Sequence, residues 1–413
     1  MYDCRVLRKM RDGVAGFDRR VWFLLGAMLV FRFGQGLYYP FSAIYFHNVL
    51  GIPLSLVGVG LACLAMASVA SGLAAGPLTD RYGRKPVMLT SLTGSAATFL
   101  AFAHVEDLAG YLAVSVAAGL FGSTMFDASR NAMVADVTLR GRRSRAYGLV
   151  RVGGNVGWAL GPMVAGFVSA AGSSGRIYPL LFTGTATLTM IVMFSVAVGV
   201  RESLPVARGS ARSSRPFSGL GEALSDRSLL ILLASGVLLF YVFTQDWQAL
   251  PVYAKNFVGV PDGRIGVFLG ANGLMVIMLQ IPISHLIDRT SKIGALLAGA
   301  VLFAASSATL LLTESFLGIL VAFAGFFTLA KMVLDVAGNT LAADLAPVKL
   351  RGTYLALFET CFSLSYRMSP IVAGTLLQAR MPALIWTAQI IAAGCAATEL
   401  IALALRTRAR NTR

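Results

Sequence analysis

The stretch Gly76-Pro-Leu-Thr-Asp-Arg-Tyr-Gly-Arg-Lys-Pro86 lies between two long apolar segments and combines glycines with a dense group of charges. A glycine at position 83 allows a tight turn between two helices, and Gly76 allows two helices to approach closely. A worn copy, Ser-His-Leu-Ile-Asp-Arg-Thr-Ser-Lys, stands 208 residues further on, at 284–292. The copy keeps the acid and two bases but loses the glycines. The chain therefore carries one polar connection twice.

The surrounding chain repeats at the same offset. Identical residues occupy equivalent positions at Tyr45 and Tyr253, Asn48 and Asn256, Asp80 and Asp288, Asp127 and Asp335, Asn131 and Asn339, Pro162 and Pro370, and Gly166 and Gly374. A repeat this long in an apolar chain indicates a transporter built from two similar halves, which enclose a site at their seam and rock about it.

The composition indicates a membrane protein. Hydrophobic residues make up 56% of the 413 residues and charged residues 13%, against about 25% charged in soluble domains. A helix needs about 20 apolar residues to cross a bilayer, and the apolar runs are too continuous for barrel strands. We predict an all-α fold of twelve transmembrane helices in two pseudo-symmetric six-helix bundles, 1–200 and 227–413, joined by a cytosolic linker, 201–226. The predicted spans are 21–46, 54–76, 86–105, 109–135, 146–170, 178–200, 228–252, 264–286, 293–313, 316–344, 353–377 and 382–405.

The formal net charge of +16 is a topology signal. Most lysines and arginines fall in the two tails and in the loops around 81–85, 140–145, 201–227 and 289–292, which share one side of the predicted membrane. The opposite loops hold only Arg176, Lys255, Arg264 and Arg380. By the positive-inside rule both termini are cytosolic, and we expect a multi-pass protein of the cell (inner) membrane. Nucleic acid is not an expected partner, and no cleavable signal peptide is visible.

Several classes of chemistry lack their residues. The four cysteines are scattered, so no disulfide framework is predicted. His47, His104 and His285 lack ligand spacing, so no metal site is predicted. The sequence has no GxxxxGK[ST] loop for nucleotide and no convergent nucleophile set. We therefore expect neither an enzyme nor a cofactor, and a monomer in the bilayer.

The 76–85 stretch resembles the signature motif G-x-L-a-D-r-x-G-r-k of the major facilitator superfamily, and the resemblance extends to the twelve spans, two halves and central loop. It implies a fold with alternating access and an inner latch that holds the outward-open state, in which Asp80 caps a helix of the opposite half. Asp136 is placed to pair with Arg81 or Arg84. The alternative is that the bases only keep the loop inside. The expected latch residues are Gly76, Asp80, Arg81, Gly83, Arg84, Asp136, Arg143, Asp288, Arg289, Asp344 and Arg351.

The fifth predicted helix carries a second pattern, formed by Gly148, Gly157, Gly161, Pro162 and Gly166. Small residues four apart let helix backbones approach closely, and proline bends a helix. The pattern resembles the antiporter motif of the drug:proton branch of that superfamily, with Ala165 in place of one glycine. The match favours export over import, although such glycines also serve ordinary packing.

Charged residues inside spans are costly and usually face a cavity or a partner. Similar depths in the predicted helices suggest a layer of ion pairs formed by Asp127, Arg130, Arg151, Lys331, Asp335 and Glu359. Such a layer either couples proton uptake to rocking or permanently fixes helix register. The i,i+3 spacing of Asp127 and Arg130 favours a structural pair. Arg151 and Glu359 lack a partner on their own helix, which favours coupling.

The substrate cavity is predicted to be lined by Arg32, Gln35, Tyr38, Tyr39, Asn155, Gln245, Asp246 and Trp247. Arg32 is the candidate contact for an anionic or polar group, or else a structural anchor. Aromatic walls suit bulky hydrophobic cargo, but membrane bundles are aromatic-rich anyway. We predict a proton-coupled exporter of amphiphilic or drug-like small molecules. The alternatives are an importer of a polar or anionic metabolite, a lipid flippase, and a non-transporting membrane sensor.

Overall fold

The computed structural model describes residues 17–139, 142–171, 177–203, 220–347 and 350–411. Within these ranges all the regular secondary structure is helical, which agrees with the predicted all-α class. The internal contacts divide the chain into two compact units: unit 1 comprises Met1–Ser42 and Cys63–Arg208, and unit 2 comprises Ala43–Ala62 and Gly209–Arg413. Most of the predicted linker, 204–219, lies outside the described residues.

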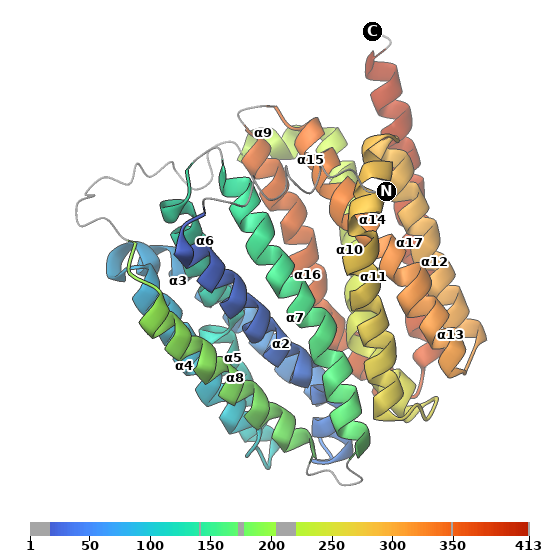
Figure 1. Cartoon of the computed structure of the whole chain (residues 1–413). Coiled ribbons are helices and arrows are strands. Elements are labelled where there is room, and N and C mark those ends of the chain that lie inside the picture. Colours follow the sequence, from blue (N-terminus) through green and yellow to red (C-terminus); the bar gives the residue numbers. More distant parts are fainter. Residues whose placement is uncertain (1–16, 140–141, 172–176, 204–219, 348–349, 412–413) are drawn as a thin grey trace, which may run out of the picture. The chain divides into compact units, whose positions relative to one another are not determined.

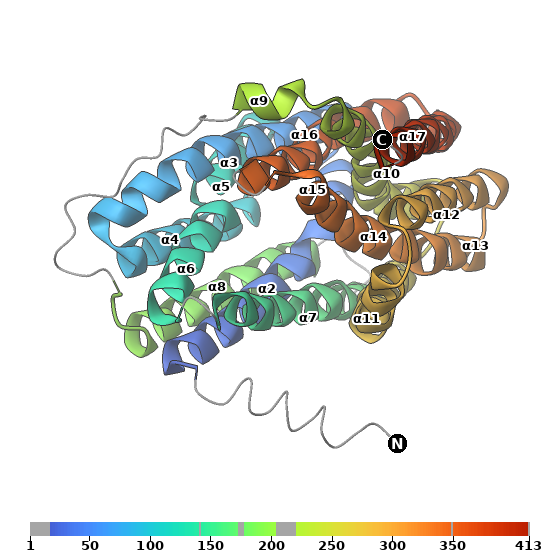
Figure 2. The ribbon, with the colours of Figure 1, turned by 90° about the horizontal axis from the view of Figure 1, so that it is seen from above.

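The described residues before the linker form a series of helices (Figure 1). They are α2 (Arg19–Asn48), α3 (Leu54–Tyr82), α4 (Arg84–Phe102), α5 (Leu108–Phe121), α6 (Ser123–Val137), α7 (Arg143–Ala171) and α8 (Ile177–Gly199). In unit 1, α2 lies between α7 and α8 (Figure 2). Thr185 of α8 donates a hydrogen bond to the carbonyl of Gly34 in α2.

The short helix α9 (Leu220–Ser225) lies within the predicted linker. The described helices after it are α10 (Arg227–Asn256), α11 (Asp262–Asp288), α12 (Lys292–Leu312), α13 (Phe316–Leu320), α14 (Thr328–Val333), α15 (Asn339–Leu345), α16 (Arg351–Gln378) and α17 (Pro382–Asn411). Two π-helical segments, η2 (Val321–Phe327) and η3 (Leu334–Gly338), separate α13, α14 and α15. In unit 2, α10 packs along α16 and α17, and α12 packs along α17.

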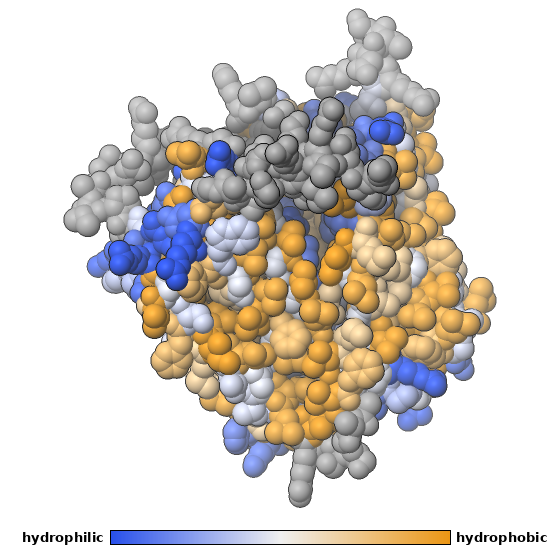
Figure 3. Space-filling model, in the orientation of Figure 1, coloured by the Kyte–Doolittle hydropathy of each residue, from blue (hydrophilic) through white to orange (hydrophobic). Residues whose placement is uncertain are grey.

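Nine helical stretches in the described part are long and apolar enough to cross a membrane, by length and composition. The long helices α4, α7 and α16 are not among them. Helices α7 and α16 are counterparts in the 208-residue repeat, and both are interrupted by arginines and small polar residues. Hydrophobic residues cover the visible sides of the helices and hydrophilic residues concentrate near the helix ends (Figure 3).

The predicted helix 109–135 is broken. At Gly122 the backbone is extended (φ −73°, ψ −163°), and this residue separates α5 from α6. Two hydroxyls of α4 compensate the lost helical bonds, because Ser91 and Ser95 donate to the carbonyl of Phe121 at 2.8 and 2.9 Å. The repeat-related helix 316–345 is also irregular, since it contains both π-helical segments. Such segments inside helices are frequent at functional sites.

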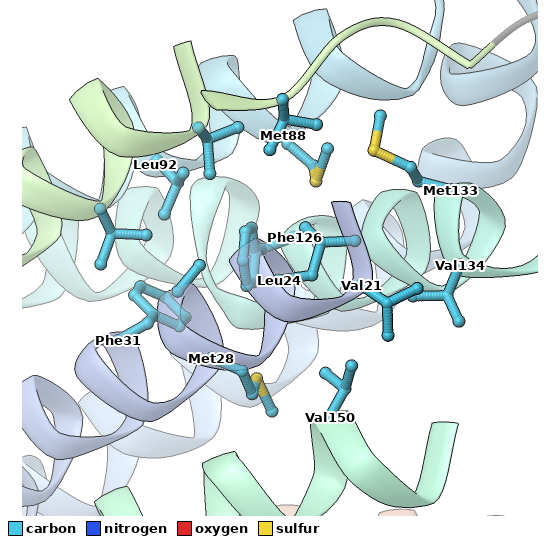
Figure 4. Close-up of a cluster of buried hydrophobic side chains, with 14 of the residues drawn as sticks. Val21, Leu24, Met28, Phe31, Met88, Leu92, Phe126, Met133, Val134 and Val150 are labelled. Carbon is cyan, nitrogen blue, oxygen red and sulfur yellow. The ribbon is translucent and has the colours of Figure 1, made fainter. Parts of the chain in front are cut away.

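The core of unit 1 is a cluster of buried aliphatic, aromatic and thioether side chains (Figure 4). Leu24, Met28 and Phe31 of α2 meet Phe126 and Met133 of α6 there. Phe31 and Phe126 have ring centroids 5.0 Å apart. This cluster fixes the rotation of α2 against α6 and so positions the polar side chains of both helices.

Glycines of α7 bring its backbone onto that of α2. A Cβ atom at Gly157 would lie 2.3 Å from the carbonyl oxygen of Leu29, and one at Gly161 would lie 2.5 Å from that of Phe33. Gly36 faces Gly161 in turn, with 3.0 Å between its own hypothetical Cβ and the Gly161 Cα. Gly157 and Gly161 of the predicted glycine pattern therefore form a close helix crossing within unit 1.

Hydrogen-bonding side chains occupy the equivalent crossing of unit 2. Ser365 of α16 donates to the carbonyl of Val237 in α10 at 3.1 Å, and Ser369 and Thr244 share a hydrogen bond of 2.6 Å. By the 208-residue offset, Ser365 corresponds to Gly157, Ser369 to Gly161, and Thr244 to Gly36. One duplicated crossing is thus stabilised by backbone proximity in unit 1 and by side-chain hydrogen bonds in unit 2.

The ends of α2 and α3 that belong to unit 2 pack tightly within it. The amide of Leu54 donates to Oε1 of Gln378 at 2.7 Å, and Gly374 of α16 lies against the Leu54 carbonyl. Asn48 and the repeat-related Asn256 exchange two amide hydrogen bonds of 2.8 and 3.0 Å. These contacts explain why residues 43–62 group with unit 2.

Candidate functional site

An ion cluster lies within unit 1 where α2 meets α6. Nη2 of Arg32 is 2.6 Å from Oδ2 of Asp127, and Nη1 of Arg130 is 3.2 Å from Oδ1 of the same carboxylate. Arg32 also donates to Oε1 of Gln35 at 2.7 Å. The Arg32 and Asp127 side chains are 16% and 28% exposed, so protein does not fully enclose this ion pair.

The cluster carries one negative and two positive charges. The guanidinium of Arg130 is buried; it donates to Oδ1 of Asn131 at 2.9 Å and lies against the Met28 sulfur. Asp127 therefore links α2 to α6 through Arg32, in addition to its same-helix pair with Arg130. The sequence spacing predicted the pair of Asp127 with Arg130, whereas the pair of Asp127 with Arg32 emerges only from the structure. Two cations on one carboxylate leave a surplus of positive charge for an incoming group.

The other residues of the predicted ion layer lie in different settings. Arg151 and Glu359 are exposed, and the described residues include no salt bridge to either. The ammonium of Lys331 lies 5.5 Å from the ring centroid of Phe243 and 6.0 Å from that of Trp247, which is a cation–π arrangement. Asp335 lies in η3. A proton-coupling role for these four residues stays a prediction.

The signature loop forms a compact network in unit 1. Arg84 is the centre: its Nε lies 2.8 Å from Oδ2 of Asp136, and its Nη1 lies 3.3 Å from Oδ1 of Asp80. Of the two predicted partners for Asp136, the structure selects Arg84, whereas Arg81 lies over the ring of Tyr82. The Asp80 side chain is 67% exposed. Its predicted helix-capping role stays a prediction.

An acid that sequence analysis missed completes this network. Glu202, just beyond the end of α8, accepts hydrogen bonds from the amides of Arg84 and Lys85 at 3.1 and 2.9 Å. It thereby caps the N-terminus of α4, where a negative charge is favourable. Gly83 has a φ of 103°, a conformation that suits glycine, and Glu202 lies against it. The sequence shows Glu202 as an isolated acid just beyond an apolar segment. Sequence spacing alone does not predict that this acid contacts the turn at Gly83.

The remaining latch residues do not form the same network. Arg143 donates to the backbone carbonyls of Ala135 and Thr138, at the end of α6, instead of pairing with an acid. In the second copy, Asp288 is 73% exposed and 3.9 Å from Lys292. Arg289 and Asp344 are exposed, Gly76 has no atom within 4 Å of a hypothetical Cβ, and the Arg351 side chain lies outside the described part. The repeat of this stretch at 284–292 therefore forms a weaker network than the first copy.

The predicted cavity residues divide into two groups. In unit 1, Tyr38 packs against Phe99 and Phe182, and Tyr39 packs edge-on against Trp158 at 5.7 Å. Asn155 is exposed. In unit 2, Trp247 stacks on Phe323.

Gln245 and Asp246 are wholly buried inside unit 2 and present no surface to a ligand in this structure. The prediction that Gln245 and Asp246 line a substrate cavity is therefore wrong for this structure. The reason is helix rotation: Asp246 turns toward α17, where Nε2 of Gln389 donates to its Oδ1 at 2.7 Å.

The Major Facilitator Superfamily model matches residues 24–329 and 247–413. The chain is 24% identical over 360 residues to an uncharacterized MFS-type transporter, YttB, of Bacillus subtilis, covering 87% of this chain and 88% of that protein. It is 27% identical over 364 residues to a Na(+), Li(+), K(+)/H(+) antiporter of Planococcus maritimus, covering 81% and 84%. It is 24% identical over 334 residues to the multidrug resistance protein MdtH of Yersinia enterocolitica, covering 81% and 80%.

Solved structures show the same fold at low sequence identity. The nucleoside transporter NupG superposes with a TM-score of 0.73 and 13% identity, covering 94% of this chain and 98% of that chain. A peptide transporter POT in complex with sulfate superposes with a TM-score of 0.74 and 16% identity, covering 96% of each chain.

Proposed function

Because this chain belongs to the major facilitator superfamily and is a multi-pass secondary transporter, not an enzyme, we propose that it exports amphiphilic small molecules across the cell membrane in exchange for protons. The direction is supported by the α7 glycine pattern and by similarity to proteins named as an antiporter and a multidrug resistance protein. The proposed orientation places both termini in the cytosol, as the distribution of lysine and arginine favours.

The observation that carries proton coupling is the shared carboxylate of Asp127. It joins Arg32 of α2 to Arg130 of α6 at 2.6 and 3.2 Å. Protonation of Asp127 would remove the negative charge that holds Arg32 to α6. Since charged pairs inside a span have few alternative partners, loss of this pair would change the relative stability of two helix arrangements. Proton binding would thereby couple to rocking.

The same cluster favours a second candidate, import of an anionic metabolite together with protons. When Asp127 is protonated, Arg32 is released and its guanidinium can bind an anionic group of a cargo molecule. Proton and anion would then bind together, which is the logic of symport. In an antiporter, by contrast, cargo and proton bind in turn. The sign of the coupled proton movement therefore separates the two candidates.

Purified protein in liposomes that contain a pH-sensitive dye tests both. Ethidium serves as the amphiphilic probe and succinate as the small anion. Export by exchange predicts that an ethidium gradient drives protons in the opposite direction, whereas symport predicts that succinate carries protons with it. Liposomes with the Asp127→Asn variant are the control, and we expect them to lose coupled proton movement. If wild-type protein moves no protons with either probe, the proposed coupling is wrong.

A further inference from the structure

Asp246 is a carboxylic acid sealed inside unit 2. Its side chain is 0% exposed in α10, and Oδ1 accepts one hydrogen bond, of 2.7 Å, from the neutral amide of Gln389 in α17. Oδ2 has no hydrogen-bond partner. In the described residues no lysine or arginine lies within salt-bridge distance of it. Asp262, another acid of unit 2, is by contrast 2.6 Å from Lys255.

The neighbouring helices supply no compensating charge. The described part of α12 has no titratable side chain after Lys292, and α11 has none between Arg264 and His285. Tyr241, also on α10, interacts electrostatically with Asp246. Neither Arg367 on α16 nor Lys331 on α14 makes a salt bridge with Asp246, whose side chain interacts with Gln389. On α17, Glu399 follows Gln389 by ten residues, about 15 Å along the helix.

An ionised carboxylate in this position is expensive. Removing an ion from water costs several kcal/mol unless a counter-charge and further hydrogen bonds compensate. One neutral amide compensates a small part of that cost. A bound proton removes the charge altogether, so burial without a counter-charge favours the protonated carboxyl group.

Gln389 and Ser307 allow the site to satisfy both forms. Ser307 of α12 lies 2.7 Å from Oε1 of Gln389 and 3.1 Å from the carbonyl of Phe303. Its single hydroxyl hydrogen serves one of them at a time. With Asp246 ionised, Ser307 donates to Gln389 Oε1, and Gln389 Nε2 donates to Asp246. With Asp246 protonated, a turned amide accepts from the carboxyl O–H, Nε2 donates to Ser307, and Ser307 donates to Phe303.

We propose that Asp246 is a proton-binding site of this transporter, with Gln389 and Ser307 as positioning residues that follow its charge by reversing their hydrogen bonds. The inference rests on the proposed proton coupling and adds a second site to it, in the other half of the repeat. The step forms or breaks one O–H bond on Asp246, and the proton is exchanged with water when the unit opens. No other bond changes.

Infrared spectroscopy of purified protein in detergent tests protonation without any cargo. Wild type at neutral pH is expected to show the carbonyl stretch of a protonated carboxyl group, and Asp246→Asn to lack it. Asp262→Asn is the matched control, because the acid it removes has a cation, Lys255, at 2.6 Å, so the band should persist. Ser307→Ala should shift the band by weakening the reversed hydrogen-bond chain. Identical bands in wild type and Asp246→Asn would overturn the inference.

The liposome assay with ethidium then separates this inference from the proposed function. Asp246→Asn is expected to abolish ethidium-driven proton movement, while Asp262→Asn retains it. If ethidium drives protons equally in wild type and in Asp246→Asn, the proposed function stands and the inference about Asp246 is wrong. If wild type moves no protons, the proposed coupling is wrong, and the infrared band still decides whether Asp246 holds a proton. Thermal unfolding of each variant shows whether a loss reflects misfolding.

Discussion

Replacing Gly157 by alanine tests whether the α2–α7 crossing depends on the absence of a side chain. The added Cβ would lie 2.3 Å from the carbonyl oxygen of Leu29 and 2.7 Å from the amide nitrogen of Phe33. Optimal contacts between heavy atoms are about 3.5–4.0 Å, so α7 must move away from α2 by roughly 1 Å. Overpacking of this kind costs about 1–3 kcal/mol.

A matched variant removes the effect of helix propensity. Gly148, on the same helix, has no atom within 4 Å of its hypothetical Cβ. Alanine in a helix interior is favoured over glycine by up to about 1 kcal/mol, and both variants gain that contribution. The difference between Gly157→Ala and Gly148→Ala therefore isolates the steric cost, about 1–3 kcal/mol.

The duplicated crossing offers a second control. Ser365, the counterpart of Gly157, already carries a Cβ, so Ser365→Ala removes one hydrogen bond to Val237 without adding an atom. Interhelical hydrogen bonds in membrane proteins are worth about 0.6 kcal/mol on average. Thermal unfolding in detergent is followed by tryptophan fluorescence. Gly148→Ala should have the highest unfolding temperature, Ser365→Ala an intermediate one and Gly157→Ala the lowest. A Gly157→Ala protein as stable as Gly148→Ala would refute the steric argument.

Three further perturbations address the ion cluster and the helix ends. Asp127→Asn should break the 2.6 Å pair with Arg32 and flatten the pH dependence of transport in liposomes, and an unchanged pH profile would exclude Asp127 from coupling. Glu202→Ala should leave the amides of Arg84 and Lys85 without their acceptor, so hydrogen exchange at those two residues should speed up while exchange within α8 stays the same. Asp18 accepts from the amide of Arg20 at 2.8 Å, and side-chain hydrogen bonds from Arg20 lower the pKa of Asp18. Asp18→Ala should therefore lower the free energy of unfolding by about 1 kcal/mol, because it removes the helix cap. The stabilisation by Asp18 should be fully present above the pKa of the unfolded state and should disappear as pH falls through the lowered pKa of the folded state. An equal loss of stability at all pH values would contradict the role of the Asp18 charge.

The helix positions could be predicted because they depend on the length of apolar runs. The 208-residue repeat and the 76–85 motif likewise follow from residue identity alone. The pairing of Asp136 with the bases of that motif was predictable, since both lie at the ends of adjacent predicted spans. The structure confirms it at 2.8 Å, with Arg84 as the partner.

Contacts that depend on helix rotation could not be predicted. Sequence position gives the depth of a residue along a helix at about 1.5 Å per residue, but it does not give the direction in which the side chain points. Asp246 and Arg32 illustrate the limit. The first was expected in a cavity wall and instead turns into unit 2 toward Gln389. The second was expected either to contact cargo or to act as a structural anchor, and its contact with Asp127, 95 residues away in sequence, could not be predicted.

The repeat shows how the two halves have diverged in chemistry while keeping one helix arrangement. Adding 208 to the positions of α2 aligns Arg32 with Phe240, Gln35 with Phe243, and Tyr38 with Asp246. Polar residues in one copy are therefore replaced by aromatic ones in the other, at each of these three positions. In unit 1 the acid of the cluster is partly exposed and paired, whereas in unit 2 the acid of α10 is buried and has no cation. A partly exposed pair exchanges partners readily, and a buried acid requires opening before it can exchange a proton. Two acids with such different access can respond to different steps of one cycle, which identical halves could not do.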